Sequence, residues 1–68
     1  MDKIYFEEIL KEAEAGGPDA QYVIGKLYDC GQGVEQDYIK AKEWYKRACD
    51  NGLQIACVKY KYLIEQGY

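Results

Sequence analysis

The sequence predicts an all-α fold of four helices, and three observations lead to it. Apolar residues recur at positions i, i+3, i+4 and i+7 in four separate stretches, which is the spacing of the buried face of a helix. Glycine, proline or asparagine separates each stretch from the next, and these residues end helices or form turns. No stretch alternates with the period of two that marks a strand. We expect antiparallel helices at about residues 3–15, 18–30, 37–50 and 53–66.

The first two expected helices are bounded by helix-starting and helix-ending residues. Asp2 is the expected cap of the first helix, and Gly16-Gly17-Pro18 ends it. Pro18 suits the first turn of the second helix, because the backbone N–H that proline lacks has no partner there. Gly31-Gln32-Gly33 ends that helix, with a positive φ expected at one or both glycines. The expected inner faces are Phe6, Ile9, Leu10 and Ala13 on the first helix, and Ala20, Ile24, Leu27 and Tyr28 on the second.

The third and fourth expected helices are separated by a short break. Asp37 is the expected cap of the third helix, and Asn51-Gly52 ends it. The fourth helix runs to Gly67. The expected inner faces are Tyr38, Ala41, Trp44, Tyr45 and Ala48 on the third helix, and Ala56, Tyr60, Leu63 and Ile64 on the fourth.

The chain contains an internal repeat of 36 residues. A shift of this length places Gly16 on Gly52, Ala20 on Ala56, Leu27 on Leu63 and Gly31 on Gly67. The second and fourth helices are therefore one kind of element, which we call A, and the first and third are another, called B. Repeated helical hairpins of this kind stack into a solenoid.

The motif at the centre of the chain is Ala20-x-Tyr22-x-Ile24-Gly25-x-x-Tyr28-x-x-Gly31-x-Gly33-Val34-x-x-Asp37-Tyr38-x-Lys40-Ala41-x-x-Trp44-Tyr45-x-x-Ala48. It closely resembles the Sel-one-like repeat, a relative of the tetratricopeptide repeat. The resemblance implies one domain over residues 1–68, an α/α solenoid fragment. Residues 17–51 form one full repeat, 1–16 resemble the end of a preceding repeat, and 52–68 the first helix of a following one. The fourth helix departs from the pattern, with Tyr60-Lys61 for Leu-Gly and Ile64 for Tyr.

Nine positions of this motif have expected structural roles: Ala20, Gly25, Tyr28, Gly31, Gly33, Ala41, Trp44, Tyr45 and Ala48. Gly25 and Ala41 are expected to let two helices approach closely, because a larger side chain would separate them. Tyr28, Tyr45 and Ala48 are expected to fill the space between helices A and B.

The composition argues against several functions. The 68 residues include no His, Ser or Thr, so a Ser–His or Cys–His catalytic arrangement cannot be built within this chain. The net charge of −3 disfavours nucleic-acid binding. The three cysteines lack C-x-x-C spacing and a histidine partner, so we expect no metal site. We therefore predict a protein without catalytic residues or cofactors.

Cys49 and Cys57 flank the break between the third and fourth helices. The last turn of one antiparallel helix and the first turn of the next can approach closely enough for a disulfide. The C-x7-C spacing is also similar to the cysteine-rich, exported bacterial branch of the Sel-one-like family. The alternative is two reduced thiols in a cytosolic protein. We expect a cytoplasmic location if these cysteines are reduced, and a periplasmic or secreted one if they are bridged. Cys30 remains as a free thiol or an intermolecular link.

Two surfaces are candidates for partner binding. By resemblance to the tetratricopeptide pattern, the A helices line a concave face that carries Tyr22, Lys26 and Asp29 on the second helix and Val58, Tyr62 and Glu65 on the fourth. Ile55, Val58 and Tyr62 also form a second apolar row on the fourth helix, and a helix that is apolar on two faces needs cover on both. The alternatives are ordinary solvated faces, and a structural role for Tyr22.

Charge is distributed unequally along the chain. Residues 1–36 hold 8 acidic and 3 basic side chains, whereas residues 37–68 hold 4 acidic and 6 basic. Such polarity can steer a partner or allow head-to-tail association of two copies. The alternative is ordinary solvated helix faces.

These features predict a non-catalytic protein–protein interaction module that binds a protein or peptide, with a possible homodimer through the fourth helix. We expect it to be soluble, because no apolar run approaches the roughly 18 residues of a membrane span. One alternative is a small acidic inhibitor or immunity-type protein that blocks another protein's active surface. A second is an engineered or excised repeat fragment.

Overall fold

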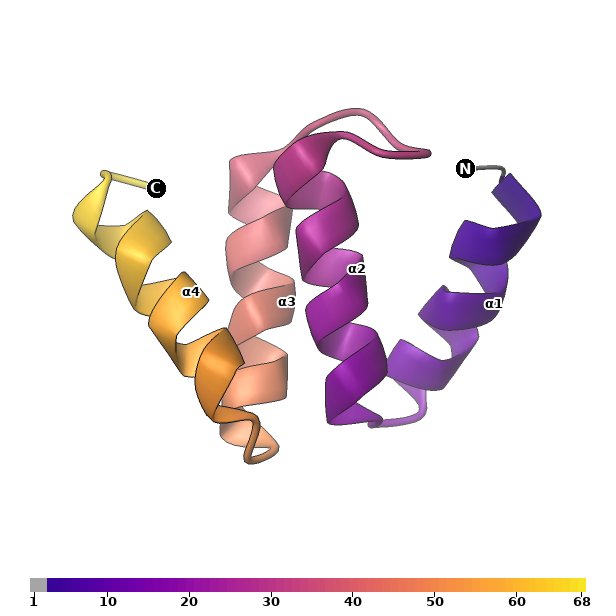
Figure 1. Cartoon of the computed structure of the whole chain (residues 1–68), viewed down its shortest axis with the longest axis horizontal. Helices are drawn as coiled ribbons and strands as arrows, with labels where there is room; N and C mark the ends of the chain where they lie inside the picture. Colours follow the sequence, from indigo (N-terminus) through magenta and orange to yellow (C-terminus); the bar gives the residue numbers. More distant parts are fainter. Residues whose placement is uncertain (1–2) are drawn as a thin grey trace.

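The computed structural model describes residues 3–68, which form four helices in one layer: α1 (Lys3–Glu14), α2 (Pro18–Cys30), α3 (Tyr38–Asp50) and α4 (Gln54–Glu65). Figure 1 shows α2 and α3 side by side at the centre, with α1 and α4 at opposite ends. The molecule measures 32 × 24 × 13 Å, and each helix packs mainly on its neighbours in sequence. The predicted all-α solenoid fragment is confirmed. Asp2, the expected cap of α1, lies outside the described residues.

The helix ends follow from local sequence. Pro18 lies in the first turn of α2, and Gly31 ends that helix in the left-handed conformation, with φ 71°. Gly33 also has a positive φ, of 76°, as the loop predicted. The Asp37 side chain accepts a hydrogen bond from the backbone N–H of Lys40 at 3.0 Å, which caps α3. Leu53 precedes α4 and provides no side-chain cap.

Two clusters of buried side chains hold the layer together. The first lies between α1 and α2 and contains Phe6, Ala13, Ala20, Ile24 and Leu27, with Trp44 and Tyr28 packed against it. The second joins α3 to α4 and α2 through Ala41, Tyr45 and Leu63, with Tyr38, Tyr60 and Tyr22 packed against it. Ala48 and Ala56 are also fully buried. Most of the predicted inner faces are therefore confirmed.

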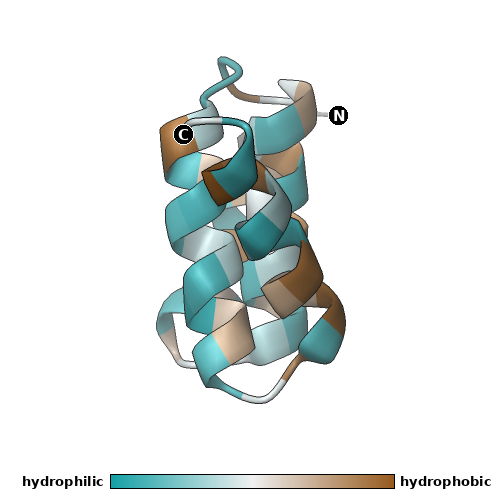
Figure 2. Ribbon diagram, turned by 90° about the vertical axis from the view of Figure 1, so that its left-hand side faces the viewer, coloured by the Kyte–Doolittle hydropathy of each residue, from teal (hydrophilic) through white to brown (hydrophobic). Residues whose placement is uncertain are grey.

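Ile64 was predicted to lie on the inner face, and this prediction is wrong, because 46% of its surface is exposed. α4 packs on α3 through Ala56 and Leu63, which are buried. The next residue, Ile64, points about 100° further round the helix. No helix of residues 3–68 covers that side, although its periodicity resembles that of a buried position. Figure 2 looks onto α4 and shows a brown, hydrophobic segment near the start of the helix and another near its end.

Gly25 provides the space for the contact between α2 and α3. A Cβ at this position would lie 2.6 Å from Cδ1 of Tyr45, far inside van der Waals contact. The Tyr45 ring, which is fully buried, therefore lies directly on the α2 backbone. Gly25 was predicted to let two helix backbones approach, and the group that lies against it is the aromatic ring of Tyr45.

Candidate protein-interaction surface

Two of the three candidate binding residues of α2, Tyr22 and Asp29, contact Tyr45 of α3. The Tyr22 and Tyr45 ring centroids are 5.6 Å apart, and the Tyr45 hydroxyl donates a hydrogen bond to Oδ2 of Asp29 at 2.9 Å. Lys26 is exposed, and its Nζ lies 5.9 Å from the centroid of the Tyr22 ring. Tyr22 thus has a structural contact as well as a partly exposed surface, and the Asp29 carboxylate has a fixed orientation.

The Tyr45 hydroxyl is electrostatically unusual. Burial of the ring raises the pKa of this hydroxyl well above its ordinary value, and the hydrogen bond to the Asp29 carboxylate raises it further. Both effects disfavour a phenolate, because a second negative charge beside Asp29 would be poorly solvated. The hydroxyl therefore remains a donor that holds Asp29 at all physiological pH values.

The candidate residues of α4 are exposed. Val58 is 62% exposed, Tyr62 56% and Ile55 47%, and Glu65 is exposed as well. The predicted second apolar row therefore lies on the surface of the described chain. Its role in binding stays a prediction.

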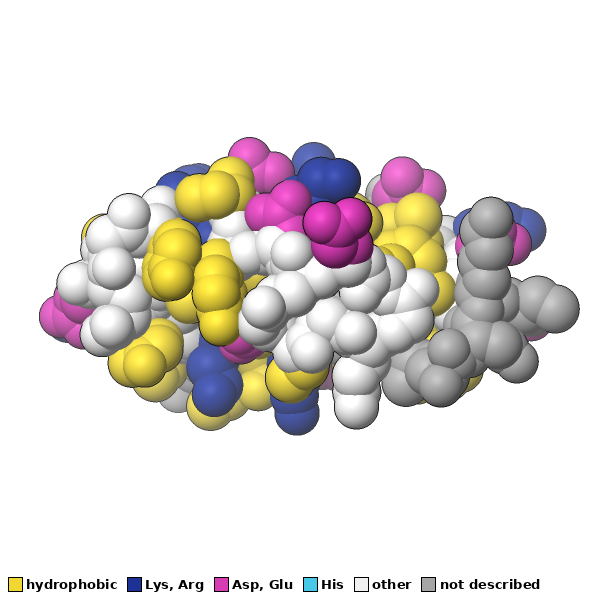
Figure 3. Space-filling view, turned by 90° about the horizontal axis from the view of Figure 1, so that it is seen from above, with side chains coloured by type: hydrophobic (Ala, Val, Ile, Leu, Met, Phe, Trp, Pro, Cys, Tyr) yellow, Lys and Arg dark blue, Asp and Glu magenta, His cyan; other side chains and the backbone are white. Residues whose placement is uncertain are grey.

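An open hollow brings candidates from both A helices together. Its volume is about 270 Å³, and Asp29 of α2 and Tyr62 of α4 both line it. Its remaining lining residues are Tyr38, Leu63, Gln66 and Tyr68. Figure 3 views this side of the molecule from above, where hydrophobic side chains gather toward the α4 end.

Sequence reasoning missed Tyr68 as part of this surface. The chain turns back after Gly67, which has a φ of 98°, and the Tyr68 N–H donates to the Leu63 carbonyl. The Tyr68 ring then lies 4.6 Å, centroid to centroid, from that of Tyr38. The match of Gly67 to Gly31 in the repeat was the signal for this turn, since both glycines follow an A helix.

A larger hollow, of about 400 Å³, lies at the loop between α2 and α3. It is lined by Tyr28, Lys40 and residues 34–37. The Lys40 ammonium lies 5.5 Å from the centroid of the Tyr28 ring. None of the predicted partner-binding residues lines it.

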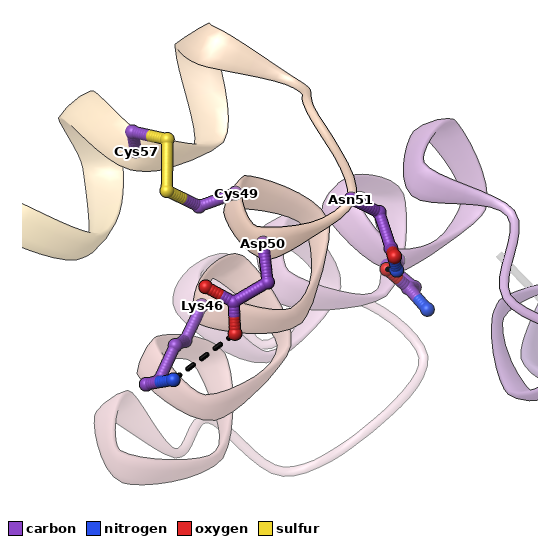
Figure 4. A network of polar contacts seen from close by, with 6 residues as sticks. Lys46, Cys49, Asp50, Asn51 and Cys57 are labelled. Carbon is purple, nitrogen blue, oxygen red and sulfur yellow. Dashed lines mark hydrogen bonds and ion pairs between the residues drawn. A yellow bond between two sulfur atoms is a disulfide. The ribbon is translucent and has the colours of Figure 1, made fainter.

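The turn between α3 and α4 brings Cys49 and Cys57 together. Their Sγ atoms are at disulfide-bonding distance, and their Cα atoms are 4.6 Å apart, as Figure 4 shows. The pairing is therefore geometrically possible, while the compartment of the protein stays a prediction. Cys30 is a free, exposed thiol.

A polar link beside this turn was not predicted. The Asn51 amide donates to Oε1 of Gln21 at 2.9 Å, and Figure 4 shows Asn51 pointing away from the cysteines. Gln21, which is almost fully buried, donates in turn to the Ala13 carbonyl at 2.9 Å. These bonds connect three successive helix ends.

Residues 3–68 offer neither a metal site nor a membrane-spanning helix. That part of the chain contains no group of three or more His, Cys, Asp or Glu side chains placed to hold a metal ion. It also contains no helix that is long and apolar enough to cross a membrane.

The chain belongs to the Sel1 repeat family, because the sequence pattern of this family matches residues 18–53, more than half of the chain. Sel1 repeats are generally non-catalytic modules of protein–protein interaction. The predicted Sel-one-like resemblance is therefore confirmed.

Two curated relatives carry similar segments. The chain is 37% identical over 46 residues to the chitin synthase regulator SKT5 of Saccharomyces cerevisiae. The aligned segment covers 68% of this chain and 7% of SKT5. It is also 34% identical over 56 residues to eukaryotic elongation factor 2 kinase of Homo sapiens. That aligned segment covers 69% of this chain and 8% of the kinase. The chain thus spans less than a tenth of either relative. Both are eukaryotic, so a bacterial origin stays a prediction. No solved structure matches the chain.

Proposed function

We propose that this repeat binds a peptide or an extended protein segment at the hollow between α2 and α4. The observation that carries the proposal is that Asp29 and Tyr62, from two different A helices, line the same hollow. A surface shared by successive A helices is the concave face on which solenoid repeats bind their partners.

The size of the hollow favours one side chain of a larger partner. Its volume of about 270 Å³ lies below the range of about 300–1,000 Å³ that is typical of small-molecule sites. Tyr62 offers an exposed ring, and aromatic side chains contribute much binding energy because they bury a large area with few rotatable bonds.

The chemistry of the hollow indicates what that side chain carries. Asp29 is held by the Tyr45 hydroxyl and supplies a negative charge beside the rings of Tyr38 and Tyr62. A carboxylate next to aromatic rings suits an arginine or lysine side chain, whose stem packs on the rings while its charge meets the acid. The name of the yeast relative describes a regulator, which is in keeping with action through binding.

Selection from a random displayed peptide library, followed by calorimetry on the selected peptides, tests this function. We expect peptides with a basic residue to be enriched, and Tyr62→Ala to weaken their binding at least tenfold. Ile39→Ala is the matched control, because Ile39 is a comparably exposed apolar residue on α3 that does not line the hollow.

Two outcomes would contradict the proposal. One is a library that yields no enriched peptide. The other is a selected peptide whose affinity falls with Ile39→Ala and not with Tyr62→Ala, because the binding surface would then lie elsewhere.

A further inference from the structure

The loop that leads into α3 contacts two of the residues that line the hollow between α2 and α4. The Gln36 side-chain amide donates a hydrogen bond to the Asp29 main-chain carbonyl at 2.7 Å and another to the Tyr38 hydroxyl oxygen at 3.0 Å. Asp29 and Tyr38 both line that hollow, whereas Gln36 lines the larger one. All three lie in α2, α3 or the loop between them, where both helices have a neighbour on either side (Figure 1).

The chemistry of the groups fixes the direction of both hydrogen bonds. A main-chain carbonyl can only accept, so the part of the Gln36 amide that faces the Asp29 carbonyl is the NH₂ group and not the oxygen. The same nitrogen accepts no hydrogen bond, so the Tyr38 oxygen must be the acceptor in the second bond. Gln36 therefore donates one N–H to each of its two partners.

The Tyr38 hydroxyl keeps its own proton for another partner. A phenolic hydroxyl both accepts and donates, and within residues 3–68 no group accepts a hydrogen bond from Tyr38. Its contact with Gln36 lies at the surface of the molecule, where a bound partner can reach it. The residues that line the hollow thus supply two complementary groups, the Asp29 carboxylate as an acceptor and the Tyr38 hydroxyl as a donor.

A basic side chain of the partner can satisfy only one of these two groups. The ammonium group of lysine and the guanidinium group of arginine carry donors and no acceptor. Either can pair with the Asp29 carboxylate, but neither can accept the proton of Tyr38. The acceptor must therefore come from another part of the same peptide, and the main chain provides a carbonyl oxygen at every residue.

We propose that the Tyr38 hydroxyl donates a hydrogen bond to a main-chain carbonyl oxygen of the bound peptide, while Asp29 receives the basic side chain of that peptide. Tyr38 is then a specificity-determining residue of the hollow.

Gln36 is a positioning residue, because it acts on the peptide through Tyr38. By donating to the hydroxyl oxygen, it leaves the hydroxyl proton for the peptide. The inference rests on the proposed function, since it describes how the same hollow recognises its peptide. It makes the main chain of the partner, and not only its basic side chain, part of what is recognised.

Variants of Tyr38 and Gln36, measured by calorimetry with a basic peptide selected from the displayed library, test the proposal. Tyr38→Phe removes the donor and keeps the ring, and we expect the affinity to fall about fivefold, the effect of one hydrogen bond. Tyr28→Phe is the matched control, because it removes the hydroxyl of a tyrosine that does not line this hollow. It should bind the peptide as wild type does.

Two substitutions of Gln36 separate the positioning of the Tyr38 proton from a purely structural role. Gln36→Glu places an acceptor where wild type has a donor, so the Tyr38 hydroxyl donates to the new carboxylate and is lost to the peptide. We expect Tyr38→Phe to cause no further loss of affinity in that background. Gln36→Leu removes the donor without supplying an acceptor, so Tyr38→Phe should still lower the affinity about fivefold there.

Three results would overturn the proposal, once circular dichroism shows that each variant remains helical. The first is a Tyr38→Phe variant that binds as tightly as wild type while Tyr62→Ala weakens binding, which leaves the proposed function intact. The second is an equal effect of Tyr38→Phe in all three Gln36 backgrounds, because Gln36 would then have no influence on the hydroxyl. The third is the absence of any peptide whose binding depends on Tyr62, which would overturn the proposed function as well.

Discussion

The α2–α3 pair and the α3–α4 pair have similar helices and are joined in different ways. α2 and α3 are connected along their lengths by side chains, with Tyr45 contacting Gly25, Tyr22 and Asp29. α3 and α4 are brought together at their shared turn by Cys49 and Cys57, and Leu63 and Tyr60 pack further along. The α2–α3 contact is thus made around one buried aromatic ring, whereas the α3–α4 contact combines the buried side chains of Ala56 and Leu63 with the paired cysteines at the turn.

The substitution with the largest expected effect disrupts the contact between α2 and α3. Gly25→Val places atoms where the Tyr45 ring already lies, since even a Cβ would be 2.6 Å from Cδ1. We expect a loss of about 3 kcal/mol in the free energy of unfolding, the upper end of the usual range for overpacking. Urea denaturation followed by circular dichroism measures it. Lys26→Val, on the next and exposed position of α2, is the control, and an equal loss there would show that valine propensity is the cause.

A somewhat smaller effect is expected where α3 meets α4. Replacing Cys49 and Cys57 together by alanine removes the cross-link between them, and the chain-entropy estimate for a loop of this length is about 2.5 kcal/mol. Urea denaturation with and without reductant measures it. If wild type and the double variant unfold at the same urea concentration under oxidising conditions, the cross-link is absent in solution.

The smallest expected effect concerns a single hydrogen bond. Tyr45→Phe removes the bond to Asp29, which should lower the stability by about 1 kcal/mol at neutral pH. Because the folded state raises the pKa of Tyr45, this stabilisation is complete below about pH 10, the ordinary tyrosine value. It is lost as the pH rises further, since the unfolded chain ionises first.

The pH dependence separates this bond from simple packing. Wild type should lose stability more steeply above about pH 10 than Tyr45→Phe does, as measured by urea denaturation at a series of alkaline pH values. Tyr62→Phe, at an exposed position, should keep the wild-type steepness. Equal slopes for wild type and Tyr45→Phe would contradict the role given to the hydroxyl.

The sequence was sufficient to predict the helices because their ends depend on local residues. Pro18, Gly31 and Asp37 act through their own backbone conformation or a capping bond to a residue nearby in sequence. The 36-residue repeat then indicated how the helices follow one another. The fold class and the approximate helix bounds could therefore be predicted from the sequence alone.

Contacts between polar side chains could not be predicted from the sequence in the same way. Gln21 and Asn51 are 30 positions apart, and a polar residue on a helix has no periodic signal that separates a buried link from a solvated face. Ile64 shows the opposite failure, because its spacing is that of a core residue and the described chain provides no cover for it. The hollow depends on the backward turn at Gly67, which brings Tyr68 to Tyr38.

The amide link through Gln21 joins helix ends without any charged group. Amide groups do not titrate, and the chain has no histidine, so the joint between the successive helix ends keeps the same hydrogen bonds from mildly acidic to mildly alkaline solution. Salt has little to screen there, because neither Gln21 nor Asn51 carries a charge. The hydrogen bonds that join these helix ends therefore depend little on pH or ionic strength over that range.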